Sequence, residues 1–155
     1  MLEVWANLPL VVTSRTYPLN PAGASCYPNA TLGQNLDAFT AAEGPGAGQV
    51  GVLPQLTENS QYRTNILAIN AGSGVANVKV ELFDGSAAKV PECTQSWPPG
   101  QVKQKVQPFK NVAGQTNLGR GYAKVTVVAG GGVMALASVV DNITNNPATL
   151  RLVRL

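Results

Sequence analysis

The chain contains no histidine, and its charged residues are few. Asp, Glu, Lys and Arg make up 12% of the 155 residues, which is about half of the usual share. Without imidazole, Ser–His and Cys–His nucleophile arrangements cannot form, and zinc sites of the usual His-containing types are excluded. A metalloenzyme would have to rely on the eight carboxylates. The composition therefore predicts a protein that is not an enzyme.

A pair of carboxylates could still serve a glycoside hydrolase, which needs two of them about 5 to 9 Å apart across a cleft. The eight acidic residues fall mostly at expected turns or on solvent-facing sides of strands: Glu3, Asp37, Glu43, Glu58, Glu81, Asp84, Glu92 and Asp141. Solvated surface charge explains each of them. A carboxylate-based glycoside hydrolase remains a remote alternative.

Long apolar runs and clusters of basic residues are also missing. No run approaches the roughly eighteen residues of a membrane helix, so no membrane span is expected in this chain. The net charge of +3 comes from scattered residues without a basic stripe, which argues against a nucleic-acid partner. The opening Met1-Leu2-Glu3 does not resemble a signal peptide. Because the chain starts within an apparent strand, we expect a fragment of a longer protein whose export signal lies upstream or has been removed.

Cysteine is nearly absent as well, with Cys26 and Cys93 far apart in the sequence. This spacing excludes CxxC redox and zinc motifs. Two interpretations stay open. Both residues are buried thiols, or they form a disulfide that ties a long loop to the body and implies export.

What the sequence has in quantity is glycine and proline, 27 residues together, between short runs of alternating polar and apolar residues. No window shows a capped helical stripe. The pattern predicts an all-β, antiparallel β-sandwich of about seven to nine strands with one long Pro/Gly-rich loop. The expected strands are Leu2–Asn7, Leu10–Tyr17, Gln49–Leu53, Tyr62–Asn70, Ala76–Phe83, Gln101–Phe109, Tyr122–Ala129, Val133–Asp141 and Thr149–Arg154.

Several strands can be assigned to faces from alternation alone. Val78, Val80 and Leu82 should face the core, while Asn77, Lys79 and Glu81 face water. The glycines of Gly130–Gly132 supply the positive φ angles of a tight hairpin. The almost wholly apolar Val133–Val140 predicts a central strand that is covered on both faces.

The domain prediction is one sandwich over residues 1–155 with a long loop at 18–48, in which one short helical turn is expected. A weak internal repeat sets Ser14 over Ser138, with an apolar run before each serine and a polar turn after it. The alternative organisation is therefore a partial repeat at 1–17 followed by a full unit at 49–155.

Two kinds of ligand site are candidates. Asp141, Asn142 and Asn145 offer hard oxygen ligands for calcium, although the same residues also cap turns by bonding their own backbone. No other cofactor is expected. Trp97, held between polar and proline neighbours, and Tyr27 near the long loop are candidate platforms for stacking a sugar, and core packing is the alternative for each.

The triplet Arg63-Thr64-Asn65 precedes the apolar run Ile66–Ile69 and raises the question of a binding site. Alternation places Arg63 and Asn65 on one face of the strand and Thr64 on the other, so the three side chains do not converge. We expect Arg63 to brace a neighbouring loop, the Pro18–Gly48 segment being the candidate. A ligand site at Arg63 and Asn65 is the alternative.

A series of short motifs along the chain resembles, in kind and order, the motifs of immunoglobulin-like modules of large exported or cell-surface bacterial proteins whose function is uncharacterised. The motifs of this chain cover nearly all of it: Ser14-Arg15-Thr16-Tyr17, Gly33-Gln34, Leu53-Pro54-Gln55-Leu56, Arg63-Thr64-Asn65, Asn70-Ala71-Gly72, Pro99-Gly100 with Gln104, and Ser138–Asn142. The resemblance implies an immunoglobulin-like sandwich outside the cell or at its surface. It brings no catalytic residues with it.

Together these features predict a non-catalytic structural or interaction module of an exported or cell-surface protein, acting in adhesion, scaffolding or assembly. Its partner is expected to be another protein or a second copy, because sandwich edges pair readily and few charges guard them here. A carbohydrate-binding module that recognises a glycan is the alternative.

Overall fold

The computed structural model describes residues 3–8, 11–16 and 33–155, without the side chains of residues 91 and 92. Its strands are β1 (Thr13–Thr16), β2 (Gln34–Asp37), β3 (Val50–Glu58), β4 (Tyr62–Asn70), β5 (Ala76–Asp84), β6 (Lys89–Trp97), β7 (Val102–Val106), β8 (Leu118–Ala129), β9 (Val133–Asp141), β10 (Pro147–Arg151) and β11 (Val153–Arg154). A 3-10 turn, η2 (Ala41–Glu43), and one short helix, α1 (Pro108–Asn111), complete the described elements. No helix among these residues is long and apolar enough to cross a membrane.

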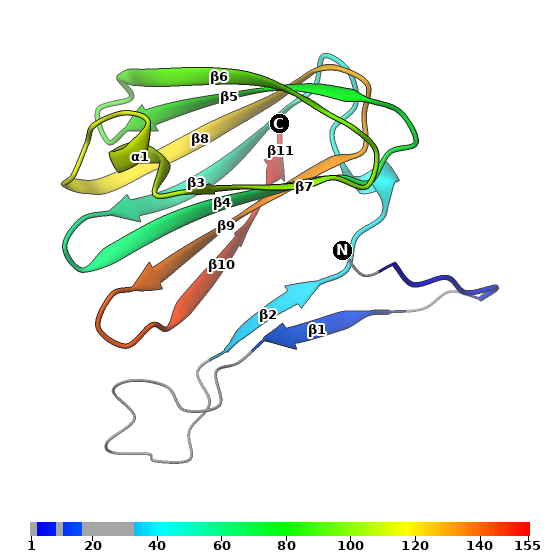
Figure 1. The fold of residues 1–155 in the computed structure, drawn as a ribbon, viewed down its shortest axis with the longest axis horizontal. Helices are drawn as coiled ribbons and strands as arrows, with labels where there is room; N and C mark the ends of the chain where they lie inside the picture. The colour runs from blue at the N-terminus through cyan, green and yellow to red at the C-terminus, as the bar shows by residue number, and fades with distance from the viewer. Residues whose placement is uncertain (1–2, 9–10, 17–32) are drawn as a thin grey trace.

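Two sheets pack face to face (Figure 1). One has the strand order β10-β9-β4-β7, and the other has the order β11-β3-β8-β5-β6. Every strand pair that the structure records is antiparallel. The prediction of an all-β, antiparallel sandwich is therefore confirmed.

The core lies between the inner faces of the two sheets, and alternation decides which side chains enter it. Ile66 and Ala68 of β4 are each 4% exposed, while Val78 of β5 and Val125 of β8 are fully buried. Leu82 is buried as expected from the same alternation. The two inner faces therefore carry the apolar half of each alternating strand.

Strand β9 lies between β10 and β4, and most of its residues are buried on both faces, as the apolar run predicts. The hairpin that leads into it from β8 uses positive φ angles at Gly130 (79°) and Gly132 (73°). Both angles lie in the left-handed region that glycine adopts without steric cost. This hairpin is the tight turn predicted from the three consecutive glycines.

Strand β6 was not predicted, because its sequence mixes polar residues with Pro91 and shows no clean alternation. It forms at the edge of the five-stranded sheet. A proline, which has no backbone N–H, is tolerated in an edge strand because one side of that strand has no neighbouring strand to accept a hydrogen bond. Strand β3 runs past its expected end at Leu53, through an irregularity with a positive φ of 55° at Gln55. In both cases pairing with a neighbouring strand, β5 for β6 and β8 for β3, forms a strand that the local sequence pattern does not predict.

The segment 33–48 contains more structure than the predicted loop. Strand β2 pairs with β1, and the 3-10 turn η2 is the helical turn that was expected there. The carboxylate of Glu43 accepts hydrogen bonds from the amide and hydroxyl of Thr40, which cap η2. The first predicted strand does not form in its described part, residues 3–7, where no neighbouring strand is present.

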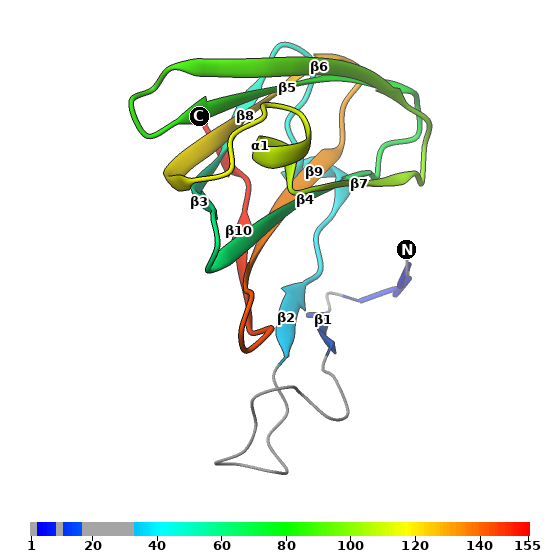
Figure 2. The ribbon, with the colours of Figure 1, turned by 60° about the vertical axis from the view of Figure 1, so that its left-hand side comes forward.

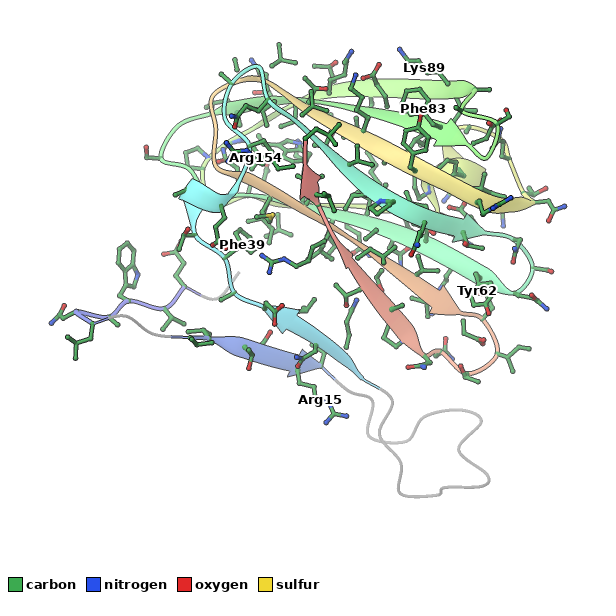
Figure 3. The ribbon with its side chains drawn as sticks, turned by 180° about the vertical axis from the view of Figure 1, so that it is seen from behind. Arg15, Phe39, Tyr62, Phe83, Lys89 and Arg154 are labelled. Atoms are coloured by element: carbon green, nitrogen blue, oxygen red, sulfur yellow. The ribbon has the colours of Figure 1, made fainter. Side chains whose placement is uncertain are left out.

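The β1–β2 hairpin lies beside β10 and projects from the sandwich (Figures 1 and 2). Its recorded polar links to β10 are a 3.4 Å hydrogen bond from Thr149 Oγ1 to the Asn35 carbonyl and a 3.6 Å ion pair between Arg151 and Asp37. Arg15 of β1 points away from the sandwich in Figure 3. The hairpin is thus attached along one side only.

Candidate functional site

Arg63, at the start of β4, connects two turns at one end of the sandwich. Its two terminal nitrogens donate to Asn142 Oδ1 and to Asn145 Oδ1, each at 2.9 Å. Asn142 Nδ2 in turn donates to the Ser60 carbonyl at 3.1 Å. The loop that Arg63 braces is therefore the β9–β10 turn, and in the described part of the expected segment, residues 33–48, no such bond is recorded. Its acceptors are the side-chain amide oxygens of two asparagines.

The calcium candidates lie in this same turn, and each already has one side-chain oxygen engaged in hydrogen bonds. Asp141 Oδ1 accepts from the backbone N–H groups of Ile143 (2.7 Å) and Thr144 (2.8 Å), and these bonds lower the pKa of Asp141. The amide oxygens of Asn142 and Asn145 face the Arg63 guanidinium. A fixed positive charge in that place disfavours a cation. Within the described residues there is also no group of three or more His, Cys, Asp or Glu side chains that could hold a metal.

Asn65 shares the outer face of β4 with Arg63, as alternation predicts, and does not join the same cluster. Its Oδ1 is buried without a hydrogen-bond partner among the described residues. Thr64 points inward, is fully buried, and donates its hydroxyl to the Thr57 carbonyl at 2.6 Å. Arg63 and Thr64 therefore fasten β4 to its neighbours, and the three side chains form no common pocket.

Trp97 is not a stacking platform. The side chain is 4% exposed and belongs to the core at the end of β6, because β6 is a strand and not the loop expected there. Tyr27 and Cys26 lie outside the described residues. Cys93 is a half-buried free thiol, so of the two interpretations of the cysteines the structure lends no support to a Cys26–Cys93 disulfide.

Asn70 is a buried polar residue at the end of β4, and from the sequence it was named only as part of the Asn70-Ala71-Gly72 motif. It is fully buried, and its Nδ2 donates to the carbonyls of Gly74 and Trp97, both at 2.8 Å. Its Oδ1 accepts from the Gly72 amide at 2.9 Å. The Asn-x-Gly spacing was the available signal, because an Asn side chain that accepts from the amide two residues on forms an Asx turn.

Glu58 is a second buried polar residue, and its expected role as solvated surface charge is wrong. It is 2% exposed, and its carboxylate accepts from the backbone amides of Phe109 (3.3 Å) and Lys110 (2.7 Å) in α1. Burial is the largest influence and raises the pKa of Glu58, while the two amide hydrogen bonds act in the opposite direction. The residue fixes α1 to the end of β3.

Glu81 lies on the outer face of the five-stranded sheet, as predicted, and yet is 5% exposed. Lysines cover it, with the nitrogens of Lys89 at 2.9 Å, Lys79 at 3.2 Å and Lys124 at 3.8 Å from its oxygens. The hydrogen bond from Lys89 is the main cause that lowers the pKa of Glu81. Figure 3 shows Lys89 near Phe83, opposite it in the sheet. This cluster links three strands through ion pairs that occupy the Glu81 carboxylate.

The described N-terminal residues expose large apolar side chains. Trp5 is 88% exposed, Leu8 is 78%, Val11 is 92% and Val4 is 52%. Figures 1 and 2 show this part of the chain reaching away from the two sheets. Clustered exposure of this kind marks surfaces that contact other molecules, whereas single exposed apolar residues need no explanation.

Comparisons with known proteins give information about the fold only. No family model and no curated protein matches the chain. A solved structure described as the crystal structure of Thermotoga maritima 1070 is similar, with a TM-score of 0.53 over 71% of this chain and 94% of the other. The two sequences are 11% identical. At that identity the likeness shows a shared β-rich fold alone.

Proposed function

We propose that this protein is a non-catalytic, immunoglobulin-like interaction module of an exported or cell-surface protein, and that it acts by assembly with other copies. The observation that carries the proposal is the exposed apolar side chains of the described N-terminal residues, 3–8 and 11–16, which project from a folded sandwich. Covering these side chains removes apolar surface from water, which favours association.

The state of the carboxylates supports the non-catalytic part of the proposal. Asp37 and Glu81 pair with basic residues, and Glu43 and Glu58 bond nearby amides. Asp84 and Asp141 close their own turns. Six of the eight acids thus have local structural roles, which leaves few for a glycosidase pair.

A second copy is the partner that the surface favours. The segment is uncharged from Val4 to Ser14 and presents Trp5, Leu8 and Val11 without acidic or basic residues between them. A charged partner would have little to recognise there, whereas an identical apolar segment is complementary to it. Strand β1 also has one edge that is not paired within the described residues.

The test is light scattering coupled to gel filtration over a wide range of concentration. The wild-type chain should form oligomers whose population rises with concentration, and Trp5→Ser combined with Val11→Ser should shift it toward monomer. Val75→Ser is the matched control, because Val75 is 55% exposed but lies on the sandwich. A strict monomer at every concentration, or equal effects of the two variants, would overturn the proposal.

A further inference from the structure

A narrow apolar crevice opens between the two sheets on the side where β6 and β7 are the edge strands. Central core residues line its floor, among them Ile66, Ala68, Val78, Val125 and Ala135. The segment 98–101 joins β6 to β7 at one end, and α1 lies at the other end with Pro108 in the lining (Figure 2). The crevice is therefore bounded on four sides and open toward solvent.

Small side chains explain why the core is not filled here. Ala68 of β4 and Ala135 of β9 are directly opposite each other in register, so two methyl groups stand where larger residues would close the gap. The free space measures about 30 Å³. It admits about two waters, and an apolar cavity of this kind tends to stay dry.

Two lysines point into the mouth of the crevice. In β7, Lys103 and Lys105 are opposite the buried Ala68 and Ile66, so their side chains face inward. Lys103 donates to the Ser96 carbonyl at 3.1 Å and lies 5.9 Å from the centre of the Trp97 ring. For Lys105, no hydrogen-bond acceptor or ion-pair partner is recorded in the described part of the chain. An ammonium group beside apolar walls gains most from an anion placed next to it.

We propose that this crevice binds an anionic amphiphile, a medium-chain carboxylate, with the alkyl chain between the sheets and the carboxylate at Lys105 and Lys103. The apolar lining matches the chain, and the two inward ammonium groups match the head. The 30 Å³ of free space means that the chain enters by displacing side chains at the mouth. Val112 lines the crevice and is 41% exposed, so it is the side chain whose displacement would widen the mouth.

Inward lysines on an edge strand also prevent pairing with other strands. That role requires only the charge, whereas ligand binding requires both the charge and the apolar space behind it. Variants that change one without the other therefore separate the two explanations.

The experiment is calorimetric titration of the full-length chain with hexanoate, octanoate and decanoate. Affinity should rise about fourfold for each added methylene. Lys105→Gln should weaken decanoate binding about tenfold and leave the binding of decanol unchanged, because it removes only the charge-assisted contact. Lys110→Gln, an exposed lysine of α1 outside the lining, is the matched control.

Two further measurements keep the result independent of folding. Ala68→Leu, or Ala135→Val if the first does not fold, should fill the crevice and abolish decanoate binding while the chain still unfolds cooperatively. In a Cys26→Ser background, decanoate should slow alkylation of Cys93, which lines the crevice. No saturable binding of decanoate, equal effects of Lys105→Gln and Lys110→Gln, or unchanged alkylation of Cys93 would overturn the proposal.

Discussion

At the scale of single residues, three buried or half-buried polar side chains hold the turns of this sandwich. Asn70, Arg63 and Glu58 each bridge segments that are far apart in the sequence or join different elements. Each satisfies backbone or amide groups that would otherwise lose hydrogen bonds on burial. Their loss should therefore destabilise the fold more than the loss of comparable exposed residues.

Asn70→Ala should lower the free energy of unfolding by about 3 kcal/mol, because it leaves the carbonyls of Trp97 and Gly74 without donors. Asn70→Asp should cost more, since it places an acceptor against the same carbonyls. Urea unfolding measures both changes. The control is Asn77→Ala, an exposed position that should change stability by less than about 0.5 kcal/mol.

Arg63→Ala should lower the free energy of unfolding by about 1 to 2 kcal/mol, because two hydrogen bonds to the β9–β10 turn are lost. Arg63→Lys should recover only part of this, since one ammonium group cannot reproduce the two-pronged contact. Thermal unfolding reports the difference, with the exposed Arg120→Ala as control. An unchanged melting temperature together with lost binding to a partner would favour the ligand-site alternative at Arg63.

Glu58 predicts a pH dependence with a definite sign. Its pKa is raised from 4.5 by burial, so the folded state holds the proton more tightly than the unfolded state. The stability that this group contributes is present below pH 4.5 and is lost as the pH rises through the raised pKa. The difference in unfolding free energy between wild type and Glu58→Gln should therefore decrease from pH 4.5 upward in urea titrations.

The matched control has the opposite sign. Hydrogen bonds from Thr40 lower the pKa of Glu43, so its contribution is present above pH 4.5 and is lost as the pH falls through the lowered value. The difference in unfolding free energy between wild type and Glu43→Gln should accordingly be present above pH 4.5 and decrease as the pH falls. Parallel pH profiles for wild type and Glu58→Gln would contradict the raised pKa.

At the scale of elements, close approaches of the backbone decide where glycine is required. In the β8–β9 hairpin, a Cβ on Gly132 would lie 2.8 Å from the amide nitrogen of Gly72. Gly114 has a similar positive φ of 68° but open space around it. Substituting Gly114 and Gly132 in turn therefore separates the free-energy cost of the left-handed backbone conformation from the cost of the steric clash.

Gly114→Ala should cost about 1 kcal/mol for the left-handed conformation alone. Gly132→Ala should cost about 3 kcal/mol or more, because the clash with the Asn70–Gly72 turn adds to the same conformational cost. Chemical denaturation of the two variants tests the comparison. Equal losses would show that the turn at Gly72 can move away.

The strands also differ in how well their sequence patterns predict them. The bounds of β4 and β9 agree with the prediction, because both alternate or are apolar throughout. Strands β2 and β6 were missed, because they are short or polar and form at sheet edges or outside the sandwich. Edge strands need apolar residues on one face at most, so periodicity identifies them poorly.

At the scale of the whole molecule, the N-terminal hairpin and the sandwich are joined by few contacts. The 3.4 Å hydrogen bond to Asn35 and the 3.6 Å ion pair to Asp37 are exposed. Exposed contacts of this kind contribute about 1 kcal/mol or less each. The sandwich should therefore be stable without the hairpin.

A chain of residues 40–155 should unfold cooperatively with a melting temperature close to that of the full chain. It retains the buried Pro45 and the Gly46–Gly131 bridge, and loses the exposed apolar residues before position 12. Under the proposed function it should also be monomeric where the full chain assembles. Calorimetry and light scattering on the same sample measure both properties, and a large loss of stability would show that the hairpin belongs to the folding unit.

The sequence alone determined the chemistry that is excluded and the side of each regular strand that faces the core. The absence of histidine rules out whole classes of site, and period-two alternation decides inside from outside at positions such as Thr64 and Ile66. These properties are local or compositional, so no knowledge of partners is needed to infer them.

Only the tertiary structure decided which distant segments meet. Arg63 reaches the turn at Asn142 and Asn145, Trp97 enters the core, and two lysines of β7 face an apolar crevice between the sheets. Each depends on strand order and register across dozens of residues, which alternation along one strand does not specify. A shift of one residue would turn Lys103 and Lys105 outward, so the candidate ligand site exists only through the register of β7 against β4.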